Sequence, residues 1–131
     1  MKVEKINYVM IMVKDLEEAS KFFAELFGTE FGSYRESKGA DARIVSSPLG
    51  IELFTPLSQD GPTAKSLEHR GEGLSVLKLK VSNLEEAVAD MESHGVKLVV
   101  RGQSPSGRIA RFHPAGLHGV MIELVEEAIT H

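Results

Sequence analysis

The segment INYVMIMVKDLEEASKFF (residues 6–23) and the segment LSVLKLKVSNLEEAVADM (residues 74–91) follow the same plan. Each begins with an apolar strand pattern, passes through a polar break, and ends in Leu-Glu-Glu-Ala and a helical pattern. Asp15 and Asn83 stand where a helix N-cap is expected. Leu-Glu-Glu-Ala alone carries little weight, because it consists of strong helix formers. The shared order of strand, cap and helix, however, indicates a duplicated unit.

The remaining elements recur in the same order. In the first half we expect strands at 6–13, 30–36, 42–47 and 50–55, and a helix that ends at Gly28. In the second half we expect strands at 74–81, 97–101, 108–112 and 120–125, and a helix through Met91. Residues 58–72 form a linker with one short helix at 63–69. The sequence therefore predicts one α+β domain, residues 1–131, built from two βαβββ modules at about 3–57 and 73–127.

Composition excludes several classes of protein. A chain of 131 residues with 42% hydrophobic content can build a single packed core. Its net charge of −4 is spread along the chain, so we expect no nucleic-acid partner. No apolar run is long enough to span a membrane, and the N-terminus enters a strand pattern without a signal-peptide core, so we expect a cytoplasmic protein. The absence of cysteine excludes disulfides, thiolate metal sites and a cysteine nucleophile.

Three segments carry a resemblance to a known family: IMVKDLEEASKFFAELFG (11–28), IELFTPLSQDGPTAKSLEHRGEG (51–73) and HPAGLHGVMIELVE (113–126). From Val3 to about Glu127 the chain resembles the vicinal-oxygen-chelate superfamily of glyoxalases, bleomycin resistance proteins and dioxygenases. Within it, the likeness is greatest to the methylmalonyl-CoA epimerases. The resemblance implies the glyoxalase-like fold, in which two modules form a half-open, curled, eight-stranded sheet around a cleft. It also implies a small-molecule ligand or substrate and a homodimer.

The resemblance implies four metal-site positions, which fall on Tyr8, Glu52, Val76 and Glu123. The family carries histidine at the positions of Tyr8 and Val76, and both histidines are replaced here. Valine offers no donor atom, and a tyrosine hydroxyl is a poor ligand beside two carboxylates. We therefore expect no metal and no other cofactor. The alternatives are a divalent metal bound weakly through Glu52 and Glu123, or an altered metal site that includes Tyr8.

Glu52 and Glu123 are the principal catalytic candidates. Each lies in an apolar strand, where a buried, unpaired carboxylate would be costly. If both point into one cleft, they could act as acid and base in proton transfer next to a carbonyl group. The structural alternative is that they face solvent on an open sheet, or form a salt bridge inside the cleft with one of three arginines, as a remnant of an ancestral site. These arginines are Arg43, Arg108 and Arg111.

Three further residues complete the predicted site. Lys78 lies two positions beyond Val76 and so on the same strand face, where its charge could replace that of a metal ion. Tyr8 could donate a hydrogen bond to an oxyanion, or could simply line the cavity. The resemblance also implies a catalytic glutamate near the third strand, and here either Glu36 or Ser37 occupies that position.

These residues favour two functions. The first is a metal-independent isomerase, epimerase-like, or a lyase, acting on a small carbonyl or acyl-thioester compound by carboxylate acid/base proton transfer. The second is a non-catalytic small-molecule binding or resistance protein that uses the same cleft. Turnover of a substrate would indicate the first function, and saturable binding without turnover would indicate the second.

Overall fold

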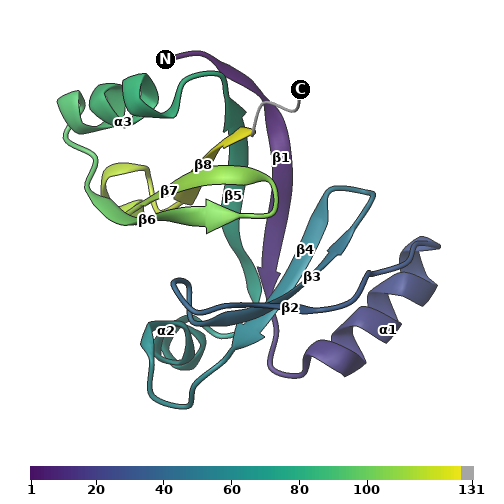
Figure 1. Ribbon diagram of the computed structural model, residues 1–131. Helices are drawn as coiled ribbons and strands as arrows, with labels where there is room; N and C mark the ends of the chain where they lie inside the picture. Colours follow the sequence, from purple (N-terminus) through teal and green to yellow (C-terminus); the bar gives the residue numbers. More distant parts are fainter. Residues whose placement is uncertain (128–131) are drawn as a thin grey trace. The chain divides into compact units, whose positions relative to one another are not determined.

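The computed structural model describes residues 1–127 and contains eight strands and three α-helices within that range. The elements follow in the order β1 (Val3–Met12), α1 (Leu16–Phe27), β2 (Arg35–Ser37), β3 (Ala42–Ser47), β4 (Ile51–Pro56), α2 (Pro62–Arg70), β5 (Gly73–Val81), α3 (Leu84–Ser93), β6 (Leu98–Ser104), β7 (Gly107–Phe112) and β8 (Met121–Glu127). A short 3₁₀ helix, η1, spans Pro114–Gly116. The order βαβββ therefore occurs twice, as the sequence predicts, with α2 in the connecting stretch (Figure 1).

The chain divides into two compact units, and the boundary falls inside the strands β1 and β5. The first unit contains residues 9–75, with the strand order β2-β3-β4-β1. β1 pairs with β4 in parallel, and the other two pairings are antiparallel. Helix α1 covers one face, where Val13, Leu16, Val45 and Leu53 form a buried cluster. Glu52 alternates with Leu53 along β4, so its side chain lies on the face opposite α1.

The second unit contains residues 1–8 and 76–127, with the strand order β5-β8-β7-β6. It repeats the pairing of the first unit, because β5 and β8 are parallel and β8, β7 and β6 are antiparallel. Helix α3 packs on one face, over a cluster that includes Leu84, Ala110, Phe112 and Leu124. Glu123 precedes Leu124 in β8 and therefore lies on the face opposite α3.

Both helices begin at the predicted caps. The Asp15 side chain accepts a hydrogen bond from the Glu18 backbone N–H at 3.0 Å, and the Asn83 side chain accepts one from Glu86 at 3.0 Å. Each satisfies one of the free N–H groups in the first helical turn. Gly28 then ends α1 in the left-handed conformation, with φ of +64°. The duplicated Leu-Glu-Glu-Ala text thus corresponds to two helix starts of the same design.

The structure corrects two of the predicted strands. The strand expected at 30–36 is only Arg35–Ser37. Residues 30–34 form no regular strand pairing, and the Gly32 N–H donates a hydrogen bond to the Ser46 carbonyl in β3 at 3.0 Å. The strand expected at 97–101 runs from Leu98 to Ser104, so residues 102–104, which lie outside the expected strands, belong to a hairpin with β7. The hairpin returns at Gly107 (φ +136°), where a Cβ would lie 2.0 Å from the Glu126 carbonyl oxygen.

Within residues 1–127, no helix is both long enough and apolar enough to span a membrane. The predicted homodimer and the predicted cytoplasmic location stay predictions.

A charged network on the second unit predicts how stability depends on pH. A hydrogen bond from Arg108, followed by one from the Leu84 N–H, lowers the pKa of Glu126, and a hydrogen bond from Arg101 lowers the pKa of Glu85. Because both folded pKa values lie below the ordinary value of 4.5, the stabilisation is complete above that pH and is lost as the pH falls through the lowered values. Urea unfolding from pH 7 to pH 3 should therefore show a decline below about pH 4.5. Glu126→Gln should weaken that decline, and an unchanged profile in this variant would contradict the assignment.

Candidate functional site

The face of the second unit opposite α3 holds a triad of charged residues: Lys78 and Glu123, which are buried, and Arg111, which is partly buried. Lys78 and Glu123 lie opposite each other in the parallel register of β5 and β8, and Arg111 lies opposite Glu123 in β7. The Lys78 Nζ is 3.3 Å from Glu123 Oε2, and Arg111 donates to Glu123 Oε1 from Nη2 at 2.8 Å and from Nε at 3.2 Å. Lys78 is only 2% exposed and Glu123 only 3%. Both carboxylate oxygens of Glu123 are thus engaged by cations.

Two cations share one carboxylate in this triad, so it carries a net positive charge. Burying such a charge is costly unless it is compensated. The Tyr8 ring lies against the triad, with its centroid 5.9 Å from Lys78 Nζ, and adds a weak attraction. Val76 is buried on the same strand face as Lys78. Lys78 therefore joins Tyr8 and Glu123 in one cluster.

The corresponding side of the first unit holds Glu52 with a different set of partners. Ser46 Oγ donates to Glu52 Oε2 at 2.6 Å, and Arg35 Nη2 donates to the same oxygen at 3.1 Å. Glu52 is 1% exposed, and its other oxygen, Oε1, is buried without a hydrogen-bond partner. The register partner of Glu52 on β1 is Met10, which offers no hydrogen-bond donor. Glu52 therefore has one anchored oxygen and one free oxygen.

Glu36 does not join Glu52. It follows Arg35 in β2, so its side chain alternates to the face that carries α1. There it is exposed and forms a 3.7 Å ion pair with Arg43, whose guanidinium lies over the Tyr34 ring. Ser37 is on the Glu52 side of the strand, but its hydroxyl oxygen accepts a hydrogen bond from the Ala40 N–H. We therefore leave Glu36 out of the candidate site.

Of the arginines predicted as alternative partners of Glu52 and Glu123, only one contacts either glutamate in the part of the chain that the structure describes. Arg111 pairs with Glu123, as one alternative predicted, whereas Arg108 pairs with Glu126 and Glu85 at the surface. The two partners of Glu52, Arg35 and Ser46, were not predicted. His113 has a structural role in its loop, because its Nδ1 accepts a hydrogen bond from the Ala115 N–H at the start of η1.

The four positions assigned to a metal by the resemblance do not suit one. Val76 has no donor atom, and Glu123 is held by two cations that would repel a divalent ion. In the part of the chain that the structure describes, no group of three His, Asp or Glu side chains is placed to hold a metal ion. Glu52 alone, with one free oxygen, would bind a hard cation weakly.

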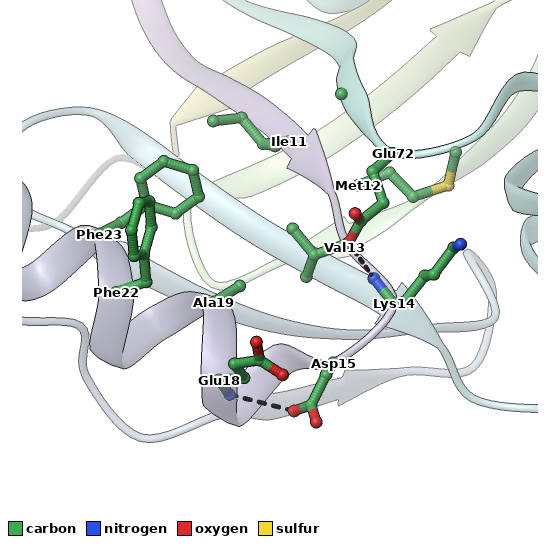
Figure 2. A pocket seen from close by; sticks show the side chains of 11 residues that line it. Ile11, Met12, Val13, Lys14, Asp15, Glu18, Ala19, Phe22, Phe23 and Glu72 are labelled. Carbon is green, nitrogen blue, oxygen red and sulfur yellow. Dashed lines mark hydrogen bonds between the residues drawn. The ribbon is translucent and has the colours of Figure 1, made fainter.

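A groove of about 650 Å³ lies elsewhere in the first unit, beside α1 (Figure 2). Its apolar wall includes Ile11, Val13, Phe22 and Phe23, and Glu72 lies at its rim, where it accepts a hydrogen bond from the Lys14 N–H at 2.8 Å. None of the predicted catalytic residues lines this groove. It is therefore separate from the Glu52 cluster.

Comparisons with known proteins identify the family. The family model described as the Glyoxalase/Bleomycin resistance protein/Dioxygenase superfamily matches residues 7–124. Human mitochondrial methylmalonyl-CoA epimerase is 28% identical over 92% of this chain and 72% of its own. The crystal structure of methylmalonyl-CoA epimerase from Mycobacterium tuberculosis has a TM-score of 0.85, with 30% identity, and the match covers 97% of this chain and 90% of that one.

A Streptomyces coelicolor methylmalonyl-CoA epimerase variant, in complex with 2-nitronate-propionyl-CoA, has a TM-score of 0.88 at 24% identity, over 98% of this chain and 100% of that one. This likeness supports the glyoxalase-like α+β fold. Together with the family match over residues 7–124, it confirms the resemblance found in the sequence. The chain belongs to the glyoxalase/bleomycin resistance protein/dioxygenase superfamily.

Proposed function

We propose that this protein removes and returns a proton at the carbon next to the carbonyl of a small acyl thioester, without using a divalent metal ion. The substrate class follows the relatives, which are named as methylmalonyl-CoA epimerases, one of them bound to 2-nitronate-propionyl-CoA. The metal-independent part rests on one observation. Lys78 and Arg111 are held on a single buried carboxylate, where the family places a metal ligand.

Glu52 is the proton acceptor in this proposal. Its Oε1 is buried and has no donor, whereas Oε2 is anchored by Ser46 and Arg35. The C–H bond of the substrate breaks, the proton moves to Glu52 Oε1, and the electron pair shifts so that the carbonyl oxygen becomes negatively charged. Return of a proton to carbon reverses these changes. A positioned carboxylate is well suited to such a step.

Lys78 and Arg111 stabilise the negative charge on the carbonyl oxygen, and Tyr8 is a further candidate donor. Fixed cations in a dry environment stabilise developing charge better than water, because they need not reorganise during the reaction. Glu123 is assigned a different role from the one its sequence suggested. Its two oxygens hold Lys78 and Arg111, so it orders the cations rather than exchanging protons. Each role is assigned within one unit: that of Glu52 in the first unit and that of the triad in the second.

A binding or resistance protein is the second candidate function. It is favoured by the ion pairing of Glu123, since this leaves Glu52 as the one carboxylate of the predicted pair with a free oxygen. Inversion at carbon commonly uses a separate proton donor on the opposite side. A protein that only holds an acyl compound would need no such donor.

Deuterium exchange distinguishes the two functions. We expect the wild-type protein, incubated in D₂O with propionyl-, methylmalonyl- and ethylmalonyl-CoA, to introduce deuterium at the α-carbon of at least one of them. Lys78→Met should slow this exchange about 10²- to 10³-fold, the usual effect of losing one oxyanion partner. Mass spectrometry of the thioester measures both rates. Saturable binding of these thioesters without exchange would contradict the proposed reaction and support the binding protein.

A further inference from the structure

We propose that Arg35 and Ser46 are positioning residues that hold one oxygen of Glu52 and thereby reserve the other for the ligand. This inference rests on the proposed function, in which Glu52 is the proton acceptor. The three residues come from three neighbouring strands: Arg35 from β2, Ser46 from β3 and Glu52 from β4. The antiparallel register of β3 and β4 sets Ser46 directly opposite Glu52.

The hydrogen bonds form a closed triangle. Arg35 Nη1 donates to Ser46 Oγ at 3.2 Å, Ser46 Oγ donates to Glu52 Oε2 at 2.6 Å, and Arg35 Nη2 donates to the same oxygen at 3.1 Å. Two donors on one oxygen restrict rotation of the carboxylate about its last bond. Oε1 then points to a fixed place without a donor of its own. Buried polar atoms are nearly always satisfied, so Oε1 is the atom of Glu52 that remains to accept a hydrogen bond from a ligand or from water.

The second module has no counterpart of this triangle, which argues against a merely inherited structural feature. Glu123 corresponds to Glu52, and its register partner in β7 is Arg111 rather than a serine. In the matching strand, Gly102 stands opposite Ile109, as Arg35 stands opposite Ile44 in the first module. A glycine offers no donor side chain. The two glutamates thus differ in their partners: Glu123 has both oxygens engaged by cations, and Glu52 has one oxygen free.

Steady-state kinetics of α-proton exchange test the inference. We expect Arg35→Met to lower kcat about 10- to 100-fold with little change in KM, because a small displacement of a catalytic group affects the reaction step more than substrate binding. Ser46→Ala should act in the same direction. Arg35→Lys keeps the charge and one contact, and it should restore part of kcat. Arg43→Met is the matched control, because this arginine lies on the neighbouring strand but pairs with Glu36 on the other face.

Thermal unfolding gives a readout that does not depend on turnover. The Tm loss caused by Arg35→Met should shrink when Glu52→Gln is already present, because the ion pair is then absent in both proteins. If the wild type shows no exchange, the proposed function fails. The non-additivity of the two Tm losses then decides by itself whether Arg35 holds Glu52. Additive Tm losses for Arg35→Met and Glu52→Gln would contradict the proposed contact between the two residues. A normal kcat in Arg35→Met, with exchange intact in the wild type, would overturn its role in positioning.

Discussion

Replacing Glu52 by glutamine is expected to slow α-proton exchange about 10²- to 10⁴-fold, the usual contribution of a general base. Glutamine has nearly the same shape and can still accept the hydrogen bond from Ser46, so the fold should persist. Its amide cannot take up the substrate proton. The exchange rate in D₂O, measured at saturating thioester, isolates this step from binding.

Glu36→Gln is the matched control for that experiment. It removes a carboxylate from the adjacent part of the same unit, but Glu36 is exposed and lies on the face that carries α1. Its exchange rate should equal that of the wild type. Equal rates in Glu52→Gln and the wild type would remove Glu52 from the mechanism, and a slow Glu36→Gln with a normal Glu52→Gln would return the role to Glu36.

Replacing Glu123 by glutamine is expected to lower the free energy of unfolding by about 3–5 kcal/mol, because buried Lys78 and partly buried Arg111 would remain without a carboxylate. Urea denaturation at pH 7 measures the loss. Adding Lys78→Met to Glu123→Gln should recover part of the stability, since one of the two stranded charges is then removed. A double variant no more stable than Glu123→Gln would show that the charges are not coupled.

Glu127→Gln provides the comparison for this loss of stability. Glu127 forms a 3.0 Å ion pair with Lys80 on the same two strands, but its side chain is 46% exposed. Exposed pairs contribute about 0–1 kcal/mol, so this variant should be nearly as stable as the wild type. Similar losses in Glu123→Gln and Glu127→Gln would mean that burial of the triad does not matter.

The sequence predicted the fold well because its strongest signals are local. Asp15 and Asn83 stand one residue before helices that begin at Leu16 and Leu84, and both side chains cap as expected. The prediction of a strand at residues 30–34 is wrong. Their composition suits a strand, but whether they pair depends on hydrogen bonds to β3, and only the Gly32 N–H makes one. The hairpin at Pro105 was hidden by Gly, Ser and Pro, which are typical of loops.

The candidate site was predictable only where strand alternation sufficed. Lys78 follows from its spacing to Val76, and the structure places it against Glu123. Arg35 gave no such signal, because its contact with Glu52 crosses β3 and requires the register of three strands. Glu36 differs from Arg35 by one position, and this single step moves its side chain to the other face. Alternation within β2 puts the two side chains on opposite faces, but only the pairing with β3 and β4 shows that Arg35 is the one on the side of Glu52.

The most direct test of the central claim, that Lys78 and Arg111 replace the family's metal ion, is the rate of α-proton exchange by chelator-treated wild-type protein, before and after addition of Mg²⁺ or Co²⁺. The proposed mechanism predicts the same rate in both states. Loss of exchange on chelation, with recovery when a divalent ion is added, would contradict it.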